Sequence, residues 1–226
     1  MSAVKPPFFF KWFNPEHLVC DLPGSDKVIY LTLDDGPIPE ATPEVLDILM
    51  KYQASATFFM VGDNVRKYPE LFQRVKDEGH SVGNHTFHHL NGWHTPPGAY
   101  IEDVHRCSEY FSTKLFRPPY GRFTPSQYLL LRKEFRFILW SVLTYDFHRR
   151  TTPGQCLDNA INNTRAGSVV VFHDSIKSMD NVRFALPRFL EHFLNLGYRF
   201  DPLPEGNNPV VNNLKIKETK INENHC

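Results

Sequence analysis

The sequence predicts an α/β fold in which a parallel sheet curls into a distorted barrel of seven or eight β/α units that need not close completely. Short apolar, β-branched runs alternate with amphipathic stretches from residue 28 to residue 200. Such alternation requires parallel strands joined by helical crossovers. Polar side chains follow several of the apolar runs, which is where the reactive residues of a barrel gather.

The first half of the chain gives the pattern β, α, β, α, β. Residues 28–33 form an apolar run that Gly36 and Pro37 end, as expected of a buried strand. Helical spacing of apolar residues predicts a helix over 42–52 and another over 69–78. Short apolar runs predict the remaining strands over 56–61 and 81–85.

The second half continues the alternation. The strongly apolar run 168–172 is the clearest strand. In order, we expect a helix over 100–113, a strand over 116–117, a helix over 125–133, a strand over 135–142, a helix over 154–164, the strand 168–172, a helix over 182–196 and a strand over 198–200.

One domain is expected over residues 28–204, because 226 residues with 41% hydrophobic content can form one sizeable core. Residues 1–27 are expected to be an extension whose aromatic residues pack on the open bottom of the barrel; a sticky patch for a lipid or a partner is the alternative. The polar composition of residues 205–226 predicts a mobile tail.

Composition excludes some classes of partner and leaves oligomeric state open. Lys plus Arg and Asp plus Glu number 25 each, so no basic stripe indicates nucleic acid. The four cysteines form no C-x-x-C pair, and free thiols are expected. The first twelve residues are too short an apolar stretch for a secretory signal or a membrane span. We therefore expect a cytoplasmic protein without a transmembrane segment. Peripheral association with a membrane is compatible with this expectation.

Two adjacent carboxylates, Asp34 and Asp35, stand at the end of the first strand in the sequence T-L-D-D-G-P. Neighbouring side chains of a regular strand point to opposite faces, so they cannot share one site there. Where the strand breaks into a Gly-Pro turn, both can reach one spot and take two different roles.

His85 and His89, in the sequence H-T-F-H-H, are spaced i, i+4, so both imidazoles can face the same side. Two imidazoles and one carboxylate are a common ligand set for a zinc-like ion. Further polar residues end the later strands of the predicted barrel and place five polar sites on one rim: Asp34-Asp35, Asn84-His85, Arg117 to Gly121, Asp146 and His173-Asp174.

With these motifs the sequence resembles the polysaccharide deacetylases that share the NodB homology domain, carbohydrate esterase family 4. Residues 32–37 are similar to its T-F-D-D-G-P, and residues 85–89 to its H-[ST]-x-x-H. Arg117-Pro118-Pro119-Tyr120-Gly121 is similar to its R-x-P-Y-G loop, and Val171-Phe172-His173 to its L-x-H ending. The resemblance covers about residues 28–200 and implies a distorted barrel that hydrolyses the acetyl group of N-acetylated sugars.

The resemblance also implies a role for each motif residue. One divalent metal ion would be bound by Asp35, His85 and His89; Zn²⁺ is expected, with Co²⁺, Ni²⁺ or Mn²⁺ as alternatives. Asp34 would be the general base, paired with Arg117, and His173 the general acid, paired with Asp146. The N–H of Tyr120 would stabilise the oxyanion. The substrate would contact Pro118, Tyr120, Val171 and Phe147.

The chain departs from the family pattern mainly in the fourth motif. The family commonly has D-x-x-D-W, whereas this chain has Leu143 to Phe147, which keeps only the second acid, Asp146. We expect the chemistry to be retained and the aromatic rim under the sugar to differ.

Each motif also has a structural interpretation. Taken alone, Asp-Asp-Gly is a turn, His173 a core histidine, Arg117 half of a surface ion pair and Asp174 a cap or turn residue.

Together, the motifs favour a deacetylase acting on N-acetylglucosamine-type sugars in peptidoglycan, chitooligosaccharide or a lipid-linked glycan. The alternatives are an amidase acting on a non-sugar amide or imide, and a sugar-binding module that has lost catalysis. The adjacent aspartates argue against a glycosidase, whose two carboxylates lie on separate elements, about 5 Å or more apart.

Overall fold

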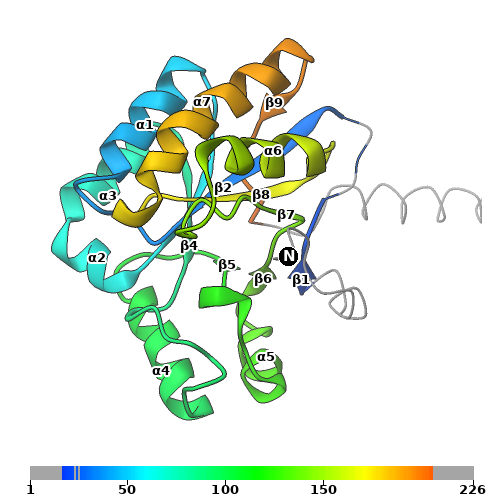
Figure 1. Cartoon of the computed structure of the whole chain (residues 1–226). Coiled ribbons are helices and arrows are strands. Elements are labelled where there is room, and N and C mark those ends of the chain that lie inside the picture. The colour runs from blue at the N-terminus through cyan, green and yellow to red at the C-terminus, as the bar shows by residue number, and fades with distance from the viewer. Residues whose placement is uncertain (1–16, 23, 25, 206–226) are drawn as a thin grey trace, which may run out of the picture.

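A single parallel sheet organises the computed structural model, which describes residues 17–22, 24 and 26–205 (Figure 1). Within these residues its hydrogen-bonded order is β1-β6-β5-β4-β3-β2-β8-β7, with β9 pairing beside β2. The strands are β1 (Leu18–Val19), β2 (Val28–Asp34), β3 (Thr57–Met60), β4 (Ser81–Asn84), β5 (Leu115–Phe116), β6 (Arg136–Ile138), β7 (Val142–Leu143), β8 (Val169–His173) and β9 (Arg199–Phe200). The predicted α/β fold with an incomplete, distorted barrel is confirmed.

The sheet curls but leaves a break between its two edge strands, β1 and β7, because the hydrogen-bonded order ends there. The chain crosses this break between β6 and β7. The single strand predicted over 135–142 is therefore wrong. The N–H of Leu139 donates to Val19 on one side of the break, and the N–H of Ser141 donates to Val169 on the other. The apolar run steps from one end of the sheet to the other, and its composition alone does not reveal this step.

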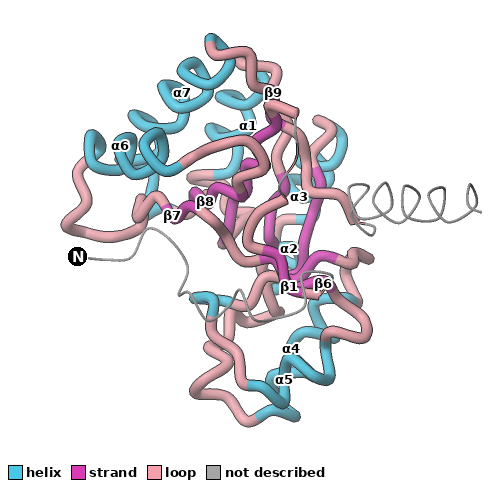
Figure 2. Tube along the Cα trace, turned by 90° about the vertical axis from the view of Figure 1, so that its right-hand side faces the viewer, coloured by secondary structure: helices cyan, strands magenta, loops and turns pink. Residues whose placement is uncertain are grey.

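Helices cover the outside of the curled sheet, with α1, α3, α6 and α7 on one side and α4 and α5 on the other (Figures 1 and 2). Two of them begin with capping boxes, in which Thr124 and Thr152 each exchange hydrogen bonds with a glutamine three residues later. The helices are α1 (Thr42–Lys51), α2 (Gly62–Lys67), α3 (Pro69–Asp77), α4 (Pro97–Ser108), α5 (Pro125–Leu131), α6 (Pro153–Asn163) and α7 (Met179–Asn195). The short helix α2 was not predicted.

The core is divided by the sheet. Val170 and Phe172 of β8 belong to the large cluster that packs against α1 and α7. Val169 belongs to a smaller cluster formed by β1, β3, β5 and β6 inside the curl. Because side chains alternate along a strand, Val171 and His173 share the inner face with Val169. The catalytic histidine suggested by the sequence therefore lies at the end of an apolar inner face.

Strand β1 was not anticipated, because two residues give no periodic signal. Leu18 and Val19 are 4% and 3% exposed and pair with Phe137 and Ile138 of β6.

The aromatic segment 8–12 and the predicted tail beyond residue 205 lie outside the described residues. Within the described part, none of the helices is both long and apolar enough to cross a membrane. Cys107 and Cys156 are buried free thiols, as predicted for them.

Candidate active site

The ends of β2, β4, β5 and β8 bring the predicted site residues together. Asp34 is in register with His173 on one side and with Phe59 on the other. Asn84 at the end of β4 is paired with Phe116, which directly precedes Arg117. Strand order thus places residues from four distant motifs at one edge, as the sequence predicted.

Arg117 is the centre of the polar network and is completely buried. Its Nη1 donates to Asp34 Oδ1 at 2.6 Å and to Thr32 Oγ1 at 2.8 Å. Its Nε and Nη2 donate to the carbonyls of Ile138 and Leu139, the residues that lead into the break in the sheet. A buried guanidinium with every one of these partners in place is fixed, so it holds the Asp34 carboxylate in one orientation. Arg117 is therefore not a surface ion pair.

The same residue orients the first histidine. The Nδ1 of His85 lies 2.7 Å from the carbonyl oxygen of Arg117, so Nδ1–H donates and Nε2 is left as a ligand atom. Burial lowers the pKa of His85 to about 4, which keeps its imidazole neutral. A neutral imidazole held through one nitrogen is the form that binds a metal ion.

Asp35 and His89 complete a three-ligand cluster with His85. One ligand atom from each of the three lies within 4.8 Å of the others, and His89 Nε2 is 3.2 Å from Asp35 Oδ1. Burial opposes ionisation of Asp35, but the hydrogen bond from His89 and the nearby cations hold its pKa well below the usual value. An ionised carboxylate, a neutral imidazole and a second imidazole fit a divalent ion of the zinc type, and three protein ligands would leave at least one coordination position of such an ion for water or substrate.

His173 and Asp146 form a second, separate pair. His173 Nδ1 lies 2.8 Å from Asp146 Oδ1, and the backbone N–H of His173 donates to Oδ2 at 2.6 Å. Burial acts to lower the pKa of His173, but the Asp146 carboxylate overcomes it and raises that pKa to about 9. The amide of Asn181 holds the Asp146 backbone carbonyl at 2.7 Å. His173 is thus a cation at neutral pH, with Nε2–H available as a proton donor.

The predicted substrate residues lie in different settings. The Tyr120 ring is 59% exposed and meets His89 edge-on at 4.8 Å between centroids. Phe147 meets the His173 ring at the same separation, so it flanks the proposed acid. Val171 is fully buried on the inner face, and Pro118 is buried, its carbonyl accepting from the N–H of Gly121. The exposed Tyr120 therefore flanks the ligand His89, and the half-buried Phe147 flanks His173.

Strained backbone collects at this rim. Asp35, His89 and Tyr120 have φ values of 89°, 56° and 61°, in the left-handed region that side chains other than glycine disfavour. Such conformations persist only where the surrounding structure enforces them, and they concentrate at functional sites.

The sequence alone suggested that Asp174 is a cap or turn residue, whereas the structure shows that its side chain holds a second segment of the chain in place. It is fully buried; Oδ1 accepts from the N–H of Gly36 at 3.1 Å, and Oδ2 accepts from the Thr42 hydroxyl at 2.6 Å. A Cβ at Gly36 would lie 2.0 Å from Oδ2, so only glycine fits there. Asp174 thus clamps the turn that presents Asp34 and Asp35, and its only sequence signal is its position after His173.

Two further residues near the ligands gave no signal. Asp103 on α4 is buried and accepts from the N–H groups of Phe87 and His88, which fixes the loop that carries His89. Lys177 lies 3.2 Å from Asp35 Oδ2 and is 56% exposed, so this ion pair contributes little to stability.

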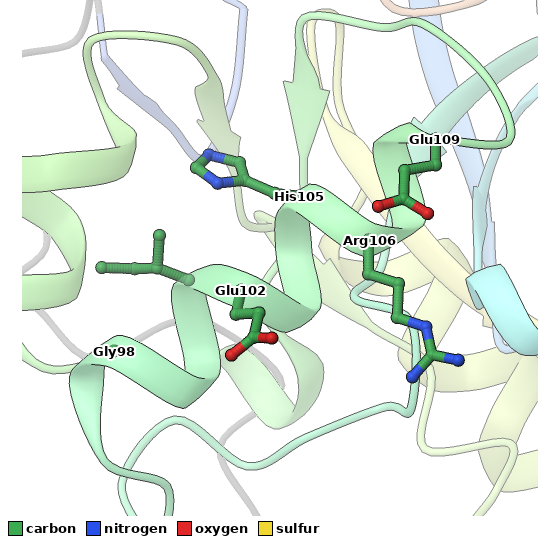
Figure 3. A pocket seen from close by; sticks show the side chains of 6 residues that line it. Gly98, Glu102, His105, Arg106 and Glu109 are labelled. Carbon is green, nitrogen blue, oxygen red and sulfur yellow. The ribbon is translucent and has the colours of Figure 1, made fainter.

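A shallow hollow of about 500 Å³ lies on α4, away from these residues (Figure 3). Its charged lining includes Glu102, His105, Arg106 and Glu109, and it contains none of the residues assigned to the rim. It is a feature of the helix surface and not part of the site.

Curated relatives share most of this chain. It is 32% identical over 197 residues to a peptidoglycan-N-acetylglucosamine deacetylase of Bacillus cereus, covering 84% of this chain and 92% of the relative. It is also 32% identical to a peptidoglycan-N-acetylmuramic acid deacetylase of Bacillus subtilis, covering 80% and 71% of the two chains. A chitooligosaccharide deacetylase of Azorhizobium caulinodans is 33% identical over 65% of this chain and 73% of its own.

Solved structures agree with this pattern. A peptidoglycan N-acetylglucosamine deacetylase crystallised with an N-oxidanyl-benzamide compound superposes with a TM-score of 0.81 at 29% identity, covering 88% of this chain and 95% of that one. The peptidoglycan deacetylase PdaC of Bacillus subtilis gives a TM-score of 0.72 at 28% identity, covering 87% and 95%. The family model described as polysaccharide deacetylase matches residues 21–134. With the motifs in order along the chain and assembled at one rim, this chain belongs to the polysaccharide deacetylase family.

Proposed function

We propose that this protein is a metal-dependent N-deacetylase that releases acetate from N-acetylglucosamine-type sugars of peptidoglycan or chitooligosaccharide. The observation that carries the proposal is the position of Arg117, whose side chain holds Asp34 and whose carbonyl holds His85. One residue therefore fixes the base relative to the ligand cluster. The names of the relatives support an N-acetylated glycan as the substrate.

The ion, for which we propose Zn²⁺, would be held by Asp35, His85 and His89. When bound, it supplies a Lewis acid for the acetamide carbonyl and lowers the pKa of water. The ligand set of two imidazoles and one carboxylate suits zinc, and it also accepts Co²⁺, Ni²⁺ or Mn²⁺.

The protein's own groups would move the protons. Asp34, fixed by Arg117, accepts a proton from the attacking water. His173 donates its Nε2 proton to the leaving amine nitrogen, and Asp146 keeps it protonated up to a pH of about 9. The peptide N–H of Tyr120 is the proposed donor to the oxygen that becomes negatively charged. Together these groups supply a base, an acid and oxyanion stabilisation on a scaffold held in place before the substrate binds.

Acetate release from a panel of substrates tests the proposal. We expect chelator-sensitive release from N-acetylchitooligosaccharides or from glycan strands, and none from the glucosamine forms that lack acetyl groups. Activity confined to small non-sugar amides would favour the amidase alternative. Glycan binding without any acetate release, in protein loaded with Zn²⁺ or Co²⁺, would favour the sugar-binding alternative and would contradict the proposal.

A further inference from the structure

A rigid aromatic surface lies next to the candidate active site, and the catalytic assignments do not use most of it. Trp93 and Tyr120 are both 59% exposed, an unusual degree for such large rings. The guanidinium of Arg122 lies between them, 4.9 Å from the Trp93 ring centroid and 6.0 Å from that of Tyr120. Since Tyr120 also contacts His89, the surface is continuous with the ligand cluster.

Arg122 is only partly exposed, and among the described residues its guanidinium is in contact with these two rings and with no carboxylate. Other arginines of the chain differ: Arg74 and Arg183 each pair with acids at the surface. A partly buried guanidinium stacked on aromatic rings keeps its planar fork of N–H donors for an external anion.

The surface is built as one unit. Gln127 of α5 is fully buried and joins the two loops that carry it: its Nε2 donates to Gly92, and its Oε1 accepts from the N–H of Thr124. The indole N–H of Trp93 donates to the carbonyl of Phe123 at 3.2 Å. A Cβ at Gly92 would lie 2.4 Å from the Arg122 carbonyl oxygen, so the two loops are in close contact. The rings are therefore positioned before any ligand binds, which lowers the entropy lost on binding.

Exposed aromatic rings offer flat faces to the apolar faces of sugar rings, and a guanidinium pairs with carboxylates. We propose that Trp93, Arg122 and Tyr120 form a subsite for the sugar adjoining the one that is deacetylated, and that Arg122 binds a carboxylate carried by that sugar. This inference rests on the proposed function, and it names a preferred substrate: a glycan that alternates N-acetylglucosamine with a sugar bearing a free carboxylate.

The test compares two tetrasaccharides that differ in one group. One alternates N-acetylglucosamine with N-acetylmuramic acid whose lactyl carboxylate is free, and the other is the same glycan with each carboxyl reduced to an alcohol. We expect Arg122→Gln to lower kcat/KM about tenfold on the first, through KM, and less than about twofold on the second, since a charge-assisted bond is lost only there. Trp93→Ala should lower kcat/KM severalfold on both, because stacking does not depend on the charge.

Arg188→Gln is the matched control. Arg188 is exposed and stacks on Phe184 at 3.9 Å, on α7 and away from the rim, so both substrates should be turned over normally. Equal losses on the two glycans in Arg122→Gln would mean that Arg122 only supports the loop, and unchanged kinetics on both would place the carboxylate away from Arg122. Either result overturns the proposal.

Calorimetric titration of both glycans into protein stripped of metal separates this inference from the proposed function. We expect the glycan with the free carboxylate to bind about tenfold more tightly than its reduced form, and Arg122→Gln to abolish the difference. This result in a protein that releases no acetate would retain the subsite and reject the deacetylase. No preference for the carboxylate in wild-type protein that does release acetate would reject the subsite alone.

Discussion

Asp34 and Asp35 are neighbours in sequence with separate environments. Asp34 points to a buried guanidinium, and Asp35 faces His89. We therefore expect Asp34→Asn to keep its metal and to lose at least about 10²-fold in acetate release, the usual scale for a general base. His85→Ala should lose most of its metal because no ligand replaces its Nε2.

Elemental analysis and acetate release, measured on the same preparations, check these two variants together. His192→Ala, which removes an exposed imidazole from α7, is the control for metal content. Loss of metal in Asp34→Asn with full metal in Asp35→Asn would exchange the two roles.

His173 gives a pH prediction because Asp146 raises its pKa to about 9. The proton that the leaving amine needs is present below that pH and is lost as the pH rises through it. Replacing the carboxylate in Asp146→Asn removes the main stabilisation of the imidazolium, so the alkaline limb of the rate profile should move to lower pH. The measurement is kcat against pH, with Asp158→Asn at the exposed face of α6 as the control. An alkaline limb that stays in place in folded, metal-loaded Asp146→Asn would remove Asp146 from the mechanism.

At the scale of elements, the clamp between β8 and the turn after β2 carries a stability prediction. Burial raises the pKa of Asp174 to about 8, so the folded state holds a proton there that the unfolded chain releases near pH 4. The contribution of Asp174 to the free energy of unfolding is fully present below about pH 4. It decreases as the pH rises toward 8, by at most about 1.4 kcal/mol per pH unit. Asp174→Asn, which cannot ionise, should flatten this part of the stability curve.

Thermal or urea unfolding between pH 5 and 8 measures the slope. Asp180→Asn is the control, since its side chain is 99% exposed. Identical slopes in wild type and Asp174→Asn would show that Asp174 is ionised within the fold.

The sequence correctly predicted the helices and strands that have a clear local pattern of apolar residues. Each site motif lies within a few residues of a strand end, so the alternation of strands and helices was enough to predict that the motifs meet at one edge of the sheet. The break after β6 could not, because residues 135–142 read as one apolar run and only pairing with Val19 and Val169 divides it. Asp103 and Asp174 were missed for a related reason: a buried carboxylate that accepts backbone N–H bonds has the same sequence appearance as one in a turn.

At the scale of the whole molecule, two residues of β1 continue the sheet on its β6 side. Leu18 is buried in the cluster beneath α4 and α5, so Leu18→Ala should lower the free energy of unfolding by about 2–4 kcal/mol. Leu129→Ala on α5 is the matched control, because that side chain is 52% exposed and its loss should change stability by less than about 0.5 kcal/mol. Urea denaturation of both variants measures the difference, and equal midpoints would show that β1 contributes little to the fold.

Arg117 holds Asp34 through its side chain and His85 through its backbone carbonyl, and this affects how such a protein can evolve. Its guanidinium can be lost by substitution, whereas its carbonyl is present whatever side chain occupies the position. A mutation here therefore removes the partner of the base and spares the partner of His85. Homologues in which this arginine is substituted are expected to bind the metal ion but no longer to turn over substrate. Metal content by itself is therefore a poor indicator of which homologues are active enzymes.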